Sequence, residues 1–168
     1  MQDLTYAYPI DRSEMYPIVN KQLESLTADE RFVIPNLANA AALLAQAIEH
    51  INWVGFYLRY QDELVLGPYQ GLPACIRIPI GKGVCGTAVA EDKIQCVPDV
   101  EFFPGHIACD SRSRSEIVVP IHYEGTVIGV LDIDSPNKNN FGSQDIKGLS
   151  DFVNILEKNC AWKEFIMS

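Results

Sequence analysis

The stretch EIVVPIHYEGTVIGVLDID, Glu116–Asp134, consists of two β-prone runs on either side of Tyr123, Glu124 and Gly125. β-Branched and aromatic residues favour strands, and a glycine able to adopt positive φ favours a tight connection between them. The stretch therefore predicts an antiparallel hairpin. It also places carboxylates in apolar strands, where a charged group costs free energy unless it binds something.

The register of this hairpin decides where its carboxylates point. A three-residue loop with Gly125 in the left-handed region sets Glu116 opposite Asp132, and Asp134 then lies on the same face because strand side chains alternate. A two-residue loop shifts the register by one and sends Glu116 to the face opposite both aspartates. We favour the three-residue loop, which predicts that all three carboxylates converge.

A convergent acidic cluster is stable only if a carboxyl is protonated, if water reaches it, or if a cation lies in it. Calcium and magnesium require six or more oxygens, and a transition metal prefers a nearby histidine. His106 and His122 lie in no HxH, HxxxH or CxxC pattern. We therefore expect an ammonium group rather than a metal, while the alternative that these residues end the strands and face solvent stays open.

Apolar positions before residue 50 repeat at helical spacing. Those from Ile34 to Ile48 predict an amphipathic helix that ends near His50, with Pro35 in or near its first turn. A shorter helix is expected before it, with three apolar side chains on one side: Val19, Leu23 and Leu26.

The runs INWVGFYLRY, ELVLGPY and IRIPI predict a meander of short antiparallel strands. A short helical segment in GKGVCGTAVAED and a long irregular section, residues 97–113, follow them. Ser143 is expected to cap a last helix. Its apolar stripe comprises Ile146, Leu149, Phe152, Val153, Leu156 and Cys160. This order of elements predicts an α+β fold in one domain, with helices packed on one face of the sheet.

The composition limits the classes of partner. The chain has 168 residues and a formal net charge of -9, which opposes binding to nucleic acid phosphates or anionic lipid. No apolar run approaches the ~20 residues that span a bilayer, and the first residues lack the pattern of a secretory signal. We therefore expect a cytoplasmic protein with no nucleic-acid or membrane partner.

The five cysteines have none of the close paired spacings of structural zinc sites. Cys96 and Cys160 lie in apolar patterns and are expected to be buried, whereas Cys85 is ambiguous. Cys109 lies in the long irregular section beside polar residues, where a thiol can be reachable and reactive. Arg112 and Arg114 would favour its thiolate, and nearby carboxylates would oppose it, so the direction of its pKa shift stays open.

Five motifs together carry a resemblance that covers residues 38–157: INWVGFYL, LVLGPYQG, IPIGKGVCGTAV, GHIACDSRSRSEIVVPI and VIGVLDIDS. They resemble the GAF-domain enzymes known as free methionine (R)-sulfoxide reductases. The resemblance implies a single GAF domain over residues 1–168, with an N-terminal segment and first helix in 1–30 and a GAF core in 31–160. It further implies an antiparallel sheet of about six strands, with the N- and C-terminal helices on one face and the ligand pocket on the other.

The resemblance also implies the reaction. Cys109 would attack the sulfoxide of free L-methionine-(R)-sulfoxide and become a sulfenic acid, and Cys75 would then form a disulfide with it. Thioredoxin would reduce that disulfide as external reductant, with no bound cofactor and no metal. It leaves open whether Cys85 assists or is dispensable.

The same resemblance assigns the substrate-binding side chains. Glu116, Asp132 and Asp134 would bind the ammonium group and the sulfoxide oxygen, with Asp132 at the ammonium as the working choice. Trp53 would pack against the substrate methyl, with a purely structural core tryptophan as its alternative.

GAF domains often pair through their helices, so a homodimer that uses the first helix and the segment LTYAYPI is a further expectation. The competing functional hypothesis is a non-catalytic GAF sensor of a small molecule or of redox state.

Overall fold

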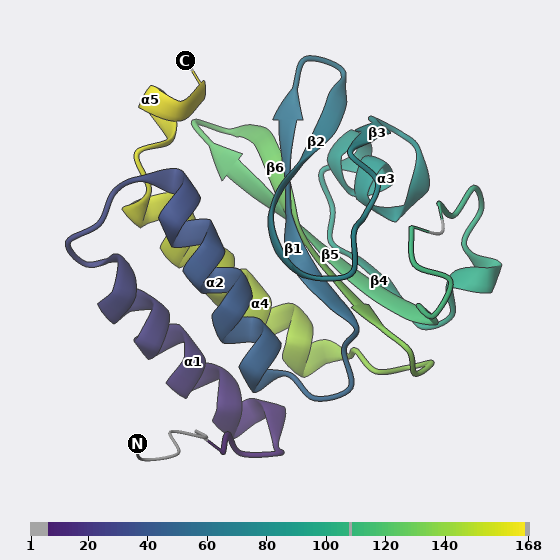
Figure 1. Ribbon diagram of the computed structural model, residues 1–168, viewed down its shortest axis with the longest axis horizontal. Coiled ribbons are helices and arrows are strands. Elements are labelled where there is room, and N and C mark those ends of the chain that lie inside the picture. The colour runs from purple at the N-terminus through teal and green to yellow at the C-terminus, as the bar shows by residue number, and fades with distance from the viewer. Residues whose placement is uncertain (1–6, 108, 167–168) are drawn as a thin grey trace.

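The computed structural model describes residues 7–107 and 109–166 (Figure 1). Its centre is a six-stranded sheet in the order β3-β2-β1-β6-β5-β4, in which each pair of neighbouring strands is antiparallel. The strands are β1 (Trp53–Tyr60), β2 (Glu63–Gly71), β3 (Arg77–Pro79), β4 (Gln95–Val97), β5 (Ser115–Tyr123) and β6 (Thr126–Ser135). The predicted α+β class and strand number are confirmed.

The helices divide between the two faces of the sheet (Figure 1). They are α1 (Arg12–Thr27), α2 (Val33–Ala47), α3 (Gly83–Glu91), α4 (Ser143–Asn159) and α5 (Trp162–Ile166), and a short 3-10 turn, η1, spans Val100–Phe102. The main core lies between one face and the helices α1, α2 and α4. The opposite face carries α3 and a second, smaller apolar cluster. Helices at both ends of the chain therefore cover one face, as the sequence predicted.

Three details of the helices differ from the predictions. Helix α1 is one residue longer than α2, 16 residues against 15, so it is not the shorter of the two. Leu26 is 47% exposed, because α1 buries side chains four residues apart, Val19, Leu23 and Thr27, and Leu26 lies beside this row. Helix α2 ends at Ala47 rather than near His50, since Ile48 is already extended.

The start of α4 also differs from the prediction. Gly142, and not Ser143, is the N-cap, and its N–H donates to the Asp145 carboxylate at 2.9 Å. Asp145 also accepts a hydrogen bond from the Tyr16 hydroxyl at 2.7 Å, so this carboxylate joins α1 to the start of α4. Ile146, expected on the apolar stripe, is 36% exposed.

The hairpin of β5 and β6 closes through two residues, not three. Glu124 and Gly125 both have positive φ, 48° and 77°, as a type I′ turn requires, and Gly125 adopts this conformation without strain. A bulge then follows: the register shifts so that Ile128 has no partner between the pairs His122–Val127 and Ile121–Gly129.

The bulge restores the face that the short loop would have lost. Glu116 pairs with Asp134, and Val118 pairs with Asp132. The predicted pairing of Glu116 with Asp132 is therefore wrong by two positions. The loop is one residue shorter than predicted, and the bulge adds one residue to β6 that the prediction lacked. Each change shifts the register by one in the same direction, so the total shift is two and all three carboxylates still share one side of the sheet.

No helix within the described residues combines the length and apolar character needed to cross a membrane. Of the segment LTYAYPI, proposed above for pairing, the first three residues lie outside the described part of the chain.

Candidate active site

A cavity lies on the α3 side of the sheet, and six of the seven predicted site residues line it. These are Trp53, Cys85, Cys109, Glu116, Asp132 and Asp134. The seventh, Cys75, is joined to Cys109 by a disulfide. The centre of a water-sized sphere can move through about 30 Å³ of this cavity, which is room for a few atoms at most.

The acidic cluster is buried in the floor of the cavity. Glu116 on β5 and Asp132 on β6 are each 6% exposed, and Asp134 is half-buried. Burial raises the pKa of all three carboxyls well above the ordinary range, and the negative charge of a neighbouring carboxyl raises it further. The raised pKa values favour the protonated carboxyl, which can donate a hydrogen bond.

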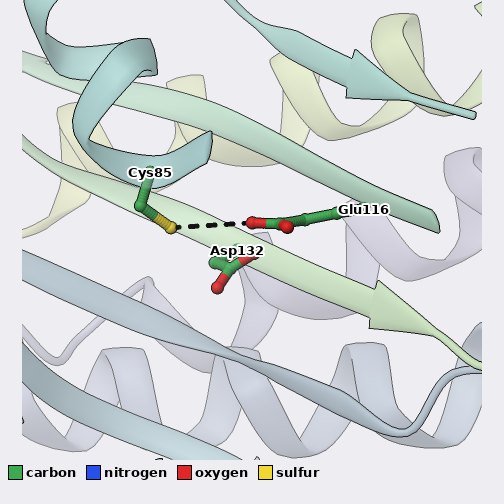
Figure 2. A group of neighbouring side chains, drawn as sticks. All are labelled: Cys85, Glu116 and Asp132. Atoms are coloured by element: carbon green, nitrogen blue, oxygen red, sulfur yellow. Dashed lines mark hydrogen bonds between the residues drawn. The ribbon is translucent and has the colours of Figure 1, made fainter. Parts of the chain in front are cut away.

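Cys85 faces this cluster from the first turn of α3. Its Sγ lies 4.0 Å from Glu116 Oε1, as Figure 2 shows, and its side chain is buried. Burial raises the pKa of the Cys85 thiol well above its ordinary value, and the charges of Asp132 and Glu116 raise it further. Cys85 is therefore a thiol, not a thiolate, at neutral pH.

The disulfide between Cys75 and Cys109 closes one side of the cavity. The two Cα atoms lie 5.6 Å apart although the residues are 34 positions apart in sequence. Cys109 belongs to the long connection between β4 and β5, and the Cys75 segment is held from β1, whose Tyr57 hydroxyl donates to the Cys75 carbonyl at 2.8 Å. The pairing of these two cysteines, which the resemblance implied, is present in the structure.

The arginines near Cys109 are occupied by other groups. The Arg112 guanidinium donates to both oxygens of Asp110, and Asn52 Nδ2 donates to Asp110 Oδ2 at 2.9 Å. The Arg112 contact holds the pKa of Asp110 well below its usual range. Arg114 donates to the backbone carbonyls of Ser111 and Ser113. Because Arg112 is neutralised by Asp110, this arginine supplies little net field at Cys109.

Trp53 forms a wall of the cavity and is packed on both sides. It is 3% exposed and stacks with Tyr57 and Tyr69, with ring centroids 5.9 Å and 5.2 Å apart. Its indole N–H donates to the Leu72 carbonyl. Gly71 makes room for the ring, because a Cβ there would lie 2.5 Å from Trp53 Cδ1. Trp53 therefore combines the two alternatives considered for it, a pocket wall and a packed aromatic residue.

His106 and Tyr57 are among the lining residues that the sequence did not assign to a substrate site. His106 Nε2 lies 3.6 Å from Glu116 Oε2, and burial lowers the pKa of His106, so the imidazole is neutral. Tyr57 lies on β1 four residues after Trp53 and points to the same side. Strand alternation could have identified Tyr57, whereas no periodic signal marks His106, which lies in an irregular loop.

The remaining cysteines lie away from the cavity. Cys160 is buried among the helices, as expected. Cys96 is half-buried on β4, less than the prediction required.

Comparison with known proteins gives the family of the chain. The family model described as GAF domain matches residues 14–159. The free methionine-R-sulfoxide reductase of Escherichia coli is 48% identical over 162 residues, 95% of this chain and 98% of that protein. The chain is a GAF domain of the free methionine-R-sulfoxide reductase family.

Solved structures of the family have the same fold. The fRMsr of Staphylococcus aureus in its reduced form has a TM-score of 0.84 and 55% identity, covering 86% of this chain and 94% of that one. The free methionine-R-sulfoxide reductase of Neisseria meningitidis in complex with its substrate has a TM-score of 0.88 and 48% identity, covering 91% and 93%. The chain thus spans nearly the whole length of these members of the family.

Proposed function

We propose that this GAF domain reduces free L-methionine-(R)-sulfoxide to L-methionine, with Cys109 as nucleophile and Cys75 as resolving cysteine. The observation that carries the proposal is the Cys75–Cys109 disulfide beside a cavity that is also lined by three carboxyls, two of them buried. The names of the relatives support the same reaction, since those of Escherichia coli and Neisseria meningitidis are called free methionine-R-sulfoxide reductases.

The cavity offers partners for each polar group of the substrate. Asp132 would accept from the ammonium group, and a protonated carboxyl of Glu116 or Asp134 would donate to the sulfoxide oxygen as charge develops there. The N-terminus of α3 faces the same cavity and has no side-chain cap, so its free N–H groups would bind the substrate carboxylate. A peptide-bound methionine lacks the ammonium and carboxylate groups that these partners require.

The proposed cycle has three balanced steps. The Cys109 thiolate attacks the sulfoxide sulfur, and the oxygen passes to Cys109 with one proton. Methionine departs, and Cys109 is then a sulfenic acid. The Cys75 thiol then displaces water from that sulfenic acid and forms the disulfide. Thioredoxin donates two electrons and two protons as its own dithiol becomes a disulfide, which restores both thiols.

The disulfide form is the state that follows product release in this cycle. Its cavity leaves about 30 Å³ to the centre of a water-sized sphere. We therefore expect reduction of the disulfide to widen the cavity before substrate binds. Movement of the long connection that carries Cys109 would achieve this.

The test is consumption of NADPH in the presence of thioredoxin and thioredoxin reductase. We expect turnover of free methionine-(R)-sulfoxide and none of the (S) epimer, of the N-acetylated sulfoxide, or with the Cys109→Ser variant. Equal rates on the free and the N-acetylated substrate would contradict the proposed role of the carboxyls. Binding of a small molecule without NADPH consumption would favour the alternative, a sensor domain.

Two further parts of the proposal concern the setting of the protein. Recycling by thioredoxin requires a reducing compartment, which supports the cytoplasmic expectation. Pairing of two copies through α1 stays a prediction, and sedimentation analysis of the full chain tests it.

A further inference from the structure

The acidic cluster contains a buried oxygen with no partner. Oδ1 of Asp132 is shielded from solvent and makes no hydrogen bond to any described residue. An oxygen in this position costs free energy unless a ligand satisfies it. Asp132 is 6% exposed and lines the cavity, so a ligand in the cavity could reach this oxygen.

A sulfur and a second carboxyl share the space in front of this oxygen. Ligand atoms of Cys85, Glu116 and Asp132 all lie within 4.8 Å of one another, and Figure 2 shows the three side chains converging from α3, β5 and β6. Three different elements of secondary structure hold them, so the arrangement is built into the fold rather than into a loop.

The chemistry of these atoms selects a class of cation. One thiolate and two carboxylates, with the neutral imidazole of His106 at 3.6 Å from Glu116, form a mixed S, O and N set. Zinc and similar divalent ions take four such ligands in a tetrahedron. Calcium and magnesium require more oxygens than this cluster provides.

The size of the cavity favours a single ion in the disulfide form. The cavity admits an atom of the size of water. Bonds of about 2.0–2.3 Å to a central ion place neighbouring ligands about 3.5 Å apart. The three side chains would therefore have to close by only about 1 Å. His106 contacts Glu116 but is not within 4.8 Å of all three, so its ring would have to move toward Cys85 and Asp132 to complete the set.

We propose that Cys85, Glu116 and Asp132 bind a zinc-class divalent cation, with His106 as the fourth ligand, when Cys75 and Cys109 are joined. Binding deprotonates the Cys85 thiol and whichever of the Glu116 and Asp132 carboxyls is protonated, and these protons pass to solvent. The ion occupies carboxyls that the proposed function assigns to the substrate, so it must leave before substrate binds and is not a cofactor. The binding itself does not depend on the proposed function.

Cobalt(II) titration of the full-length oxidised protein tests the proposal. In this form Cys75 and Cys109 are unavailable as ligands, and the free thiols are Cys85, Cys96 and Cys160. We expect a sulfur-to-cobalt charge-transfer band together with the visible bands of a four-coordinate ion, and zinc should displace the cobalt. Cys85→Ser should abolish the charge-transfer band, whereas Cys96→Ser and Cys160→Ser should retain it.

A second variant guards against misfolding of the first. Asp132→Asn keeps the thiol and should weaken cobalt affinity at least about tenfold, with far-ultraviolet circular dichroism confirming the fold of each variant. Absence of the band in the wild-type protein, or its persistence in Cys85→Ser, would overturn the proposal.

The outcome is separate from that of the NADPH assay. Turnover of sulfoxide without a cobalt band leaves the proposed function intact and removes the metal site. A cobalt band without turnover supports the metal site and contradicts the proposed function.

Discussion

The two sides of the β5–β6 hairpin differ sharply although the same two strands build both. Toward α1, α2 and α4 the strands present apolar side chains that are fully or nearly fully buried, such as Ile117, Leu131 and Ile133. Toward α3 they present Glu116, Asp132 and Asp134. Adjacent residues of one strand thus contribute alternately to the apolar core and to the cavity.

The difference shows where stability and chemistry lie in this fold. Burial of apolar area stabilises the folded state, whereas burial of carboxyls opposes it and is compensated only when they are protonated or bind a ligand. Substitutions on the helix side should therefore change stability with little effect on the activity of the folded fraction. Substitutions on the cavity side should do the opposite.

The largest contrast is expected between two cysteines on opposite sides of the sheet. Cys75→Ser removes the intramolecular thiol that resolves the sulfenic acid, so steady-state turnover should fall at least about 10³-fold after one methionine per enzyme has formed. Cys160→Ser, on the helix side, should leave turnover unchanged. Rapid-quench measurement of methionine separates the first turnover from later ones, and wild-type steady-state turnover by Cys75→Ser would break the comparison.

The next effect concerns stability on the helix side. Leu131 is fully buried, so Leu131→Ala should lower the free energy of unfolding by about 3–4 kcal/mol through lost burial and a residual cavity. Urea unfolding, with kcat measured at a temperature where the variant stays folded, tests this. A loss of kcat at full folding would show that the two sides are coupled.

The matching substitution on the cavity side is Glu116→Gln, which keeps the volume and removes the ionisable group. We expect kcat/KM for free methionine sulfoxide to fall about 10²-fold, while the free energy of unfolding changes by less than about 1 kcal/mol. Activity and urea unfolding are measured on the same preparation. A variant that loses stability but keeps activity would assign Glu116 to the fold instead of the site.

The smallest effect on stability is expected at His122, which contacts both the end of α3 and helix α4. Its Nε2 lies 2.6 Å from Asp92 Oδ1 at the end of α3, and its Nδ1 lies 3.2 Å from Glu157 Oε1 on α4. Partial burial lowers the pKa of His122, but these two carboxylates together raise it above the ordinary value. The His122 imidazole thus joins α3 on one face of the sheet to α4 on the other, and the raised pKa favours its charged form.

The sign of this contribution follows from the raised pKa. Stabilisation is complete below the unfolded value of about 6.5 and is lost as the pH rises through the higher folded value. His122→Gln should therefore lower stability at pH 6 and have less effect at pH 9, by under about 1 kcal/mol, because the side chain is 38% exposed. Urea midpoints of both proteins at the two pH values measure it, and an equal loss at both would exclude the charge as the cause.

The sequence predicted those features that repeat along the chain. Strand alternation and helical spacing identified the sheet, the helix-covered face and the convergence of the carboxyls. The resemblance to a known family, and not any periodicity, supplied the pairing of Cys75 with Cys109.

The features that were missed depend on contacts between distant segments. β6 pairs with β1 without interruption from Gly129 to Asp134, and the bulge at Ile128 lies just outside that paired region. The bulge thus begins where pairing with β1 ends. The sequence of the hairpin alone contains no information about that third strand. His106 is likewise placed by an irregular loop.

The unpaired Ile128 also limits how the gene can change in length. Deletion of this one codon would leave the turn intact but shift the register of β6 beyond the bulge by one residue. Its carboxylates would then face the helices, and its apolar side chains would face the cavity. Loss of this codon is tolerable only if the turn gains one residue, which restores the register of the two strands. We therefore expect insertions and deletions in this hairpin to occur as compensating pairs among its descendants.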